Sequence, residues 1–294
     1  MDEVLRKEEF FRDDRFPFHI TRYRIGRGEV IPSHTHDFVE LVFVVEGDAS
    51  HVMAGHTYRL RPGDVFVLEP SAYHSYIGSE HAETEVINVL FEPRFLKDEL
   101  EVLMRLPSFV NFFYFLPFMR RNASFAPYQP LEGEAMERIR DHLTTIEEEY
   151  NGQREGYQLI VKTRWIECLV WLSRYLRVEE PSSPGAAEDE DWIRTARLFV
   201  EEHYAQPLSL AQISKLCGMS VSTFTAKFKE ATGQSFLEYK QSVQIRHACA
   251  LLADTGRKVL DIALETGFND ISFFNKVFRK HTGVSPSEYR RRHA

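Results

Sequence analysis

The chain has 294 residues, of which 43% are hydrophobic and 27% are charged, and its formal net charge is −8. This length exceeds what one small core needs and suits two domains. No apolar run approaches the ~20 residues of a membrane-spanning helix, and the charged N-terminus does not have the pattern of a secretory signal. The three cysteines lie far apart in the sequence and form neither a disulfide framework nor a CxxC metal motif. These features exclude membrane-spanning and disulfide-rich secreted proteins, and they predict a cytoplasmic chain.

Residues 179–191 have the composition of a connector, with two prolines, a glycine and six acidic residues but no apolar periodicity. Such a segment buries too little apolar surface to fold by itself. We therefore expect an acidic Pro/Ser linker at 179–191 between two folded parts, residues 1–178 and 192–294.

The two parts of the chain differ in charge. Residues 1–190 hold 21 Lys and Arg against 34 Asp and Glu, whereas residues 191–294 hold 15 against 10. The net charges are therefore −13 and +5. A basic second part is typical of a domain that contacts nucleic acid, although an ordinary solvated surface can have the same balance.

The first part changes from strands to helices along its length. Within residues 20–92, short β-branched and aromatic runs alternate with Gly, Pro and Asp, which predicts a small barrel or sandwich. Residues 95–177 are expected to be helical, because apolar residues recur every three or four positions in 136–150 and a second apolar stretch covers 159–176. An apolar stripe of this kind serves either the core or self-association.

The second part contains an internal repeat at an offset of about fifty residues. The matching pairs include Phe224/Phe274, Phe228/Phe278, Thr232/Thr282, Gly233/Gly283, Ser235/Ser285, Glu238/Glu288 and Tyr239/Tyr289. Two copies of one helical unit are therefore expected, joined by an apolar-periodic segment at 236–252.

Each copy has the pattern of a helix-turn-helix. In the first, a short helix at 208–217 precedes Gly218, and Ser220 can cap a second helix. In the second, Gly267 marks the turn, and Asn269 or Asp270 can cap the next helix. Two helices joined by a glycine turn can place the second helix in the major groove of DNA.

The residues of this repeat, at 208–229, 261–278 and 283–290, resemble the AraC/XylS family of bacterial transcription regulators. The resemblance implies two DNA-reading modules in one chain, joined by a long helix at 236–252. Their recognition helices are expected to lie about one helical turn of DNA apart, ~34 Å.

Helix phase predicts which side chains face the DNA, because Phe224, Phe228, Phe274 and Phe278 face the core. Asn275 can pair with adenine and Lys276 with guanine, whereas basic residues near the helix ends suit phosphates. The expected base-reading residues are Ser222, Thr225, Ala226, Ile271, Ser272, Asn275 and Lys276, and the expected phosphate contacts are Lys229, Arg279 and Lys280.

A second constellation lies in the strand-rich part. His34, His36 and Glu40 have the spacing that puts all three on one face of a single strand, and His74 on a later strand can add a fourth ligand from the opposite wall. Imidazoles and a carboxylate are ligands of Zn, Ni, Mn or Fe. The same four residues can instead form a hydrogen-bonding cradle without metal.

With its flanking glycines and prolines, this pattern resembles the cupin fold over residues 20–92. The two resemblances together imply an α+β chain of two domains, a cupin β-barrel with following helices and an all-α double helix-turn-helix domain. A cupin ahead of this DNA-binding pair is similar to the sugar-responsive branch of the AraC family, which includes regulators of rhamnose and arabinose use. In that branch the barrel binds a small effector, the helices after it often make a homodimer, and activation through RNA polymerase is the tendency.

We therefore expect an effector, most simply a sugar, inside the barrel, lined by His34, His36, Glu40, His51, Tyr58, His74 and Tyr76. Two other functions remain open from the sequence. In the first, the complete ligand set belongs to a metal-dependent cupin enzyme that is fused to a DNA-binding domain. In the second, the barrel binds no effector and serves as a dimerisation scaffold.

Overall fold

The computed structural model describes residues 3–118, 129–176 and 191–293. The chain divides into two compact units, Met1–Glu179 and Glu180–Ala294. The expected linker at 179–191 lies outside the described residues except for its last position, where α6 begins. Within the described ranges, no helix combines the length and the apolar character needed to cross a membrane.

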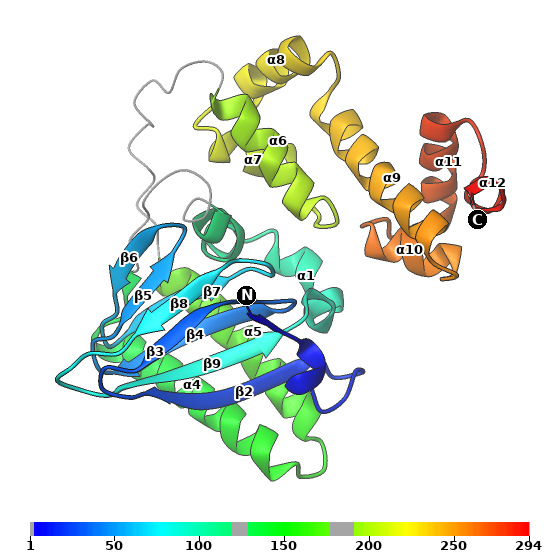
Figure 1. Ribbon diagram of the computed structural model, residues 1–294. Coiled ribbons are helices and arrows are strands. Elements are labelled where there is room, and N and C mark those ends of the chain that lie inside the picture. Colours follow the sequence, from blue (N-terminus) through cyan, green and yellow to red (C-terminus); the bar gives the residue numbers. More distant parts are fainter. Residues whose placement is uncertain (1–2, 119–128, 177–190, 294) are drawn as a thin grey trace. The chain divides into compact units, whose positions relative to one another are not determined.

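The first unit is built on two five-stranded sheets that face each other (Figure 1). The strand order is β1-β3-β8-β5-β6 in one sheet and β10-β7-β4-β9-β2 in the other. Among the described residues no strand pairing joins the two sheets, so the barrel expected from the sequence is open rather than a closed ring of hydrogen bonds. The strands are β1 (Glu3–Leu5), β2 (Phe18–Ile25), β3 (Val30–His36), β4 (Val39–Glu46), β5 (Ser50–Met53), β6 (His56–Arg59), β7 (Asp64–Leu68), β8 (His74–Ile77), β9 (Thr84–Phe91) and β10 (Gln129–Pro130).

The space between the sheets is filled by side chains that alternate along the strands. Val42 and Val44 of β4 and Phe66 and Leu68 of β7 belong to one buried cluster with Tyr58. The register pairs Val42 with Phe66, so these neighbouring strands present their apolar side chains to the same core. The outer face of β4 is buried as well, because helices cover this sheet.

The apolar periodicity predicts two long helices, and these helices pack on the second sheet. They are α4 (Gly133–Gly152) and α5 (Tyr157–Tyr175). Trp165 of α5 is fully buried, and its ring contacts Phe18 of β2 and Phe91 of β9 edge-on. Shorter elements connect the sheets to these helices: η1 (Lys7–Glu9), η2 (Pro93–Leu96), α1 (Lys97–Leu103), α2 (Pro107–Val110) and the π-helix η3 (Asn111–Phe115).

The second unit is helical, with two similar halves along α9 (Figure 1). Phe224 and Phe228 are fully buried against Phe236 in the first half, and Phe274 and Phe278 are equally buried in the second. The sequence repeat is therefore a repeat of packing. The helices are α6 (Asp191–His203), α7 (Leu210–Leu216), α8 (Val221–Thr232), α9 (Phe236–Asp254), α10 (Val259–Glu265), α11 (Ile271–Thr282) and α12 (Pro286–His293).

Candidate functional site

The expected metal ligands do not lie on one strand. His36 ends β3 and Glu40 lies in β4, and these strands belong to opposite sheets, so the chain crosses between the sheets at residues 37–38. His74 begins β8, which pairs with β3 and places His74 opposite His34 in the same sheet. The expectation that His74 lies on the wall opposite His34 and His36 was therefore wrong. Glu40 is the residue that faces the histidines from the other sheet.

Three donor atoms converge across this gap between the sheets. Nε2 of His36 lies 3.4 Å from Oε2 of Glu40, and Nε2 of His74 lies 3.9 Å from the same oxygen. The ligand atoms of these three residues all lie within 4.8 Å of one another. His34 does not belong to that group, although its ring centroid lies 4.2 Å from that of His74.

Backbone carbonyls orient the two imidazoles. Nδ1 of His36 lies 2.6 Å from the carbonyl oxygen of Phe38, and Nδ1 of His74 lies 3.2 Å from that of Ala72. Since a carbonyl only accepts, each Nδ1 carries the proton and donates it, which leaves the lone pair on Nε2. Neither Nε2 has a hydrogen-bond partner. Metal-binding histidines are commonly held in this way by their second nitrogen.

Burial controls the charge of this group. It lowers the pKa of His36 to about 4 and, together with the neighbouring histidines, lowers the pKa of His74 to about 2. Burial also raises the pKa of Glu40 to about 7. The group contains two neutral imidazoles and a carboxyl group whose ionisation is unfavourable in a buried site without a positive charge nearby. A divalent cation would satisfy this set of donors.

A cavity of about 290 Å³ opens beside this group. Of the expected effector residues, His34, Glu40 and Tyr76 line it. His36, His51, Tyr58 and His74 are not part of its wall and are buried in the surrounding core. His51, for example, stacks between Phe66 and Tyr76, with ring centroids 5.0 and 4.7 Å away. The strand pattern identified inward-facing residues but could not separate those that meet the cavity from those that fill the core.

Several lining residues were not identified from the sequence: Glu3, Leu5, Phe10, Thr21, Tyr23, Ile25, Ile31, Phe38, Val86, Asn88 and Leu90. Asn88 interrupts the apolar strand β9, and its side-chain oxygen is buried without a hydrogen-bond partner. A polar residue in an otherwise apolar strand is the signal that could have found it.

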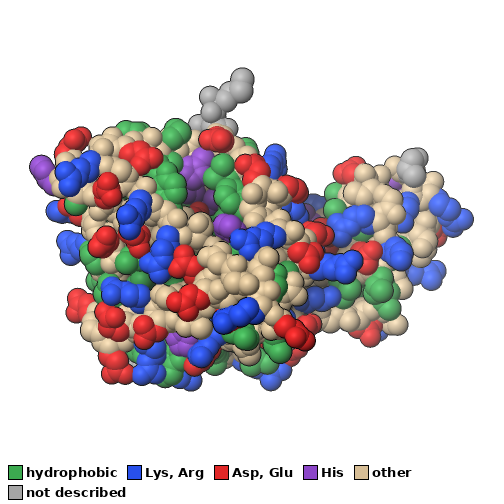
Figure 2. Space-filling model, turned by 90° about the horizontal axis from the view of Figure 1, so that it is seen from below, with side chains coloured by type: hydrophobic (Ala, Val, Ile, Leu, Met, Phe, Trp, Pro, Cys, Tyr) green, Lys and Arg blue, Asp and Glu red, His purple; other side chains and the backbone are tan. Residues whose placement is uncertain are grey.

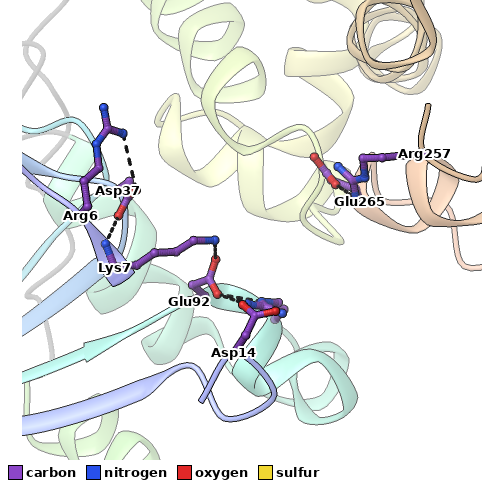
Figure 3. Close-up of polar contacts among 8 residues, drawn as sticks. Arg6, Lys7, Asp14, Asp37, Glu92, Arg257 and Glu265 are labelled. Atoms are coloured by element: carbon purple, nitrogen blue, oxygen red, sulfur yellow. Dashed lines mark hydrogen bonds and ion pairs between the residues drawn. The ribbon is translucent and has the colours of Figure 1, made fainter. Parts of the chain in front are cut away.

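The N-terminal segment forms part of the cavity wall. β1 pairs in parallel with β3, so that Glu3 lies opposite His34 and Leu5 opposite His36. The backbone N–H of Lys7 donates to Asp37, and its ammonium group lies 2.9 Å from Glu92 (Figure 3). No sequence pattern predicts so short a strand. In the space-filling view, histidine side chains are visible between hydrophobic ones on the sheet unit, among charged groups of both signs (Figure 2).

The two recognition helices are capped as the sequence predicts. The hydroxyl of Ser220 accepts from the backbone N–H of Thr223, and the carboxylate of Asp270, rather than Asn269, accepts from that of Phe273. Of the ten residues expected to face DNA, all but Ile271 are exposed. Ile271 is half-buried against the core of the second half, so it offers less surface to DNA than the other nine.

Local contacts already engage some of these exposed side chains. The hydroxyl of Thr225 donates to the carbonyl of Val221, and the ammonium group of Lys280 lies 3.6 Å from Glu238. Phe273, which we did not single out, is 49% exposed at the start of α11. Asn275 and Lys276 remain exposed polar groups on the outer face of this helix.

Comparisons with known proteins agree with both halves of this description. Residues 17–169 match the AraC-like ligand binding domain, and residues 213–292 match a helix-turn-helix domain. The chain is 26% identical to the HTH-type transcriptional activator RhaR of Enterobacter sp. (strain 638), covering 98% of this chain and 96% of that protein. It is 24% identical to RhaR of Klebsiella pneumoniae, with 98% and 97% covered.

Matches among solved structures include ToxT of Vibrio cholerae, which is 16% identical with a TM-score of 0.36 and covers 95% of this chain and 98% of that one. The C-terminal domain of AraT, a response regulator from Geobacillus stearothermophilus, is 27% identical with a TM-score of 0.34 and covers 36% of this chain and 88% of that one. The match of the ligand-binding domain covers more than half of the chain, and the relatives match along nearly their whole length. The chain belongs to the AraC family: it is a DNA-binding transcription regulator with an AraC-like ligand-binding domain followed by two helix-turn-helix units.

Proposed function

We propose that this regulator is a transcription activator whose DNA binding responds to a sugar held in the cavity between the sheets, with a divalent metal ion at the cavity wall. The observation that carries the proposal is the convergence of Nε2 of His36, Nε2 of His74 and Oε2 of Glu40 beside the cavity. Glu40 belongs to both features, since it also lines the cavity.

The residues present fit a metal ion. His36, Glu40 and His74 would hold it, and the fourth expected ligand, His34, has its ring centroid 4.2 Å from that of His74. Two nitrogens and one oxygen suit Zn, Ni, Mn or Fe, because all four accept imidazole and carboxylate ligands. A bound ion would act as a Lewis acid toward hydroxyl oxygens of a ligand in the cavity.

The remaining cavity wall supports a sugar as the effector class. Tyr23, Thr21 and Asn88 offer donors and acceptors for hydroxyl groups, and Phe10 and Phe38 offer apolar faces for C–H groups. The cavity volume of about 290 Å³ is close to the lower end of the ~300–1,000 Å³ range of small-ligand sites. The resemblance to the sugar-responsive branch of the family favours the same class.

The assembly and partners extend the proposal. We expect a homodimer, since Leu159 and Ile160 at the start of α5 are 71% and 40% exposed on a helix that otherwise packs on the sheet. Activation would require a contact with RNA polymerase, and binding to chromosomal DNA implies the cytoplasm of a bacterial cell. We propose no reaction at the metal group, because the curated relatives are transcription activators.

Metal content of the full chain tests the central point. The protein is purified without a tag, chelator or nickel resin and measured by elemental mass spectrometry. We expect about one equivalent per chain, lost in the double variant His36→Ala/His74→Ala. The control is His81→Ala, which removes an exposed histidine and should retain the metal. A metal-free wild-type protein, or a double variant that keeps the ion, would contradict the metal site.

The effector is tested separately. A panel of sugars and polyols is scored by thermal stabilisation of the full chain, because a ligand that binds only the folded state raises the melting temperature. We expect stabilisation by at least one sugar, reduced in Asn88→Leu, and a change in the affinity for a DNA duplex selected from a random pool. If no sugar stabilises the chain and none alters its DNA affinity, the cavity has another role.

A further inference from the structure

Both helix-turn-helix units pack on one helix. Helices α6 and α8 of the first helix-turn-helix unit contact α9. Helices α10, α11 and α12 of the second helix-turn-helix unit contact it as well. Reading two DNA subsites requires a fixed separation and rotation between the recognition helices, because each base pair turns the double helix by about 34°. Direct contacts between the two units would fix both quantities.

Polar side chains in the middle of α9 make such contacts. Lys240 and Gln244 are 8% and 5% exposed, and buried polar groups need hydrogen-bond partners. The amide nitrogen of Gln244 donates to the carbonyl of Tyr204, at 3.1 Å, and to that of Thr266, at 2.8 Å. Tyr204 follows α6 of the first unit, and Thr266 caps α10 of the second. One side-chain amide therefore bridges the two units.

Lys240 strengthens the same connection. Its ammonium group donates to the carbonyl of Gln206, two residues beyond Tyr204. The ring of Tyr204 also stacks on His247 of α9, with centroids 4.0 Å apart and planes inclined by 6°. One turn before Tyr204, the carboxylate of Glu201 accepts two hydrogen bonds of 2.7 Å from Arg246. Residues 204–206 are thus held along α9.

The turn of the second helix-turn-helix unit lies directly against this segment. At Gly267, φ is +87°, and a Cβ atom would lie 2.4 Å from the carbonyl oxygen of Ala205. Gly233 and Gly283 end the recognition helices at similar φ angles, yet a Cβ atom there would meet nothing within 4 Å. Gly267 therefore serves a close approach between the units in addition to its backbone conformation.

We propose that these contacts, which we call the clasp (residues 204–206, Lys240, Gln244, Thr266 and Gly267), set the spacing and phase of the two recognition helices. The chain would then select operators by the number of base pairs between its two subsites. The clasp residues are positioning residues, which act on α8 and α11 through the backbone segments they join. The inference rests on DNA binding by both units.

Operators of different spacing test the clasp. A duplex selected from a random pool by the wild-type full chain is footprinted to map the two subsites, and one or two base pairs are then inserted or deleted between them. We expect the wild-type chain to lose at least about tenfold in affinity for each single-base-pair change. Gln244→Met, which keeps the side-chain length, and Gly267→Ala should lose less than about threefold across the same series.

A matched control separates the clasp from general destabilisation. Val277→Ala truncates a buried side chain that makes none of the clasp contacts, and it should keep the spacing preference of the wild type. Each variant is also measured on a duplex with one intact subsite, where Gln244→Met should bind like the wild type if its units are folded and bind DNA. Retention of the wild-type spacing preference in Gln244→Met would overturn the inference. So would an equal loss on every duplex, including the single-subsite one.

Discussion

Nε2 of His36 lies 3.4 Å from Oε2 of Glu40, across the gap between two sheets that share no strand pairing in the described ranges. The two residues are four apart in the sequence, yet each belongs to a different sheet. Because Nδ1 of His36 donates to a backbone carbonyl, Nε2 carries a lone pair and no proton, and it has no hydrogen-bond partner. This arrangement suits a cation between the two atoms.

Glu40→Gln should therefore weaken metal binding by more than the ~10–100-fold that loss of an outer-shell partner typically costs, because it removes the carboxylate from the group of His36, Glu40 and His74. Titration of metal-depleted protein with a competing chromophoric chelator measures the affinity. Glu46→Gln, an exposed position on the same strand, is the control and should leave the affinity unchanged. Equal affinities of the Glu40→Gln variant and the wild type would remove Glu40 from the site.

Asn275→Ala and Lys276→Ala should each lower the affinity for the selected operator by about 1–3 kcal/mol and relax its sequence preference at one position. Both side chains are exposed on α11, between the buried Phe274 and Phe278 in the sequence. Fluorescence anisotropy with the selected duplex and with single-base-pair variants measures both effects. Unchanged discrimination among the duplexes would show that other side chains read the bases.

Lys229→Ala should act differently, since Lys229 is exposed in the last turn of α8, where it can reach phosphates. We expect a similar loss on selected and random duplexes and a decrease of about 1 in the slope of log affinity against log salt concentration. The measurement is a salt titration of both duplexes. A loss confined to the selected duplex would instead assign Lys229 to base reading.

Phe274→Ala should lower the free energy of unfolding of the helical unit by about 3–5 kcal/mol, because this fully buried ring fills the core of the second half. Phe273→Ala, at the neighbouring half-exposed position, is the matched control and should change it by less than about 1 kcal/mol. Urea unfolding followed by the helical circular dichroism signal compares the two. Similar losses in both variants would contradict the helix orientation.

Lys240 predicts a dependence of stability on pH. Burial lowers its pKa from the ordinary 10.5 to about 8. Between these values the unfolded chain binds a proton that the folded chain does not, so the free energy of unfolding rises with pH, by at most ~1.4 kcal/mol per pH unit. Lys240→Met should remove this contribution. Urea unfolding of both proteins at pH 8 and pH 10 checks it, and identical pH dependences would show that Lys240 titrates normally.

The sequence by itself determined the repeat, the turns and the two recognition helices of the helical unit, whereas the contacts between its two halves are seen only in the folded chain. Apolar spacing, the turn glycines and the caps Ser220 and Asp270 act within one or two helical turns, so their consequences can be followed along the chain without knowing the fold. Ile271 begins α11 and is partly buried against the core of the second half. Packing between helices decides how far such a boundary residue is buried.

In the sheet unit the sequence determined that histidines and a glutamate lie close together, and the tertiary structure decided which of them face one another and which line the cavity. The spacing of His34, His36 and Glu40 is compatible with one strand, but the crossing at residues 37–38 separates His36 from Glu40 and makes a facing pair of them. The cavity wall depends on strands distant in sequence, such as β1 and β9, which contribute Leu5 and Asn88. Strand pairing between remote segments is a long-range choice that no local pattern specifies, and for that reason only the folded chain shows which polar side chains reach the cavity.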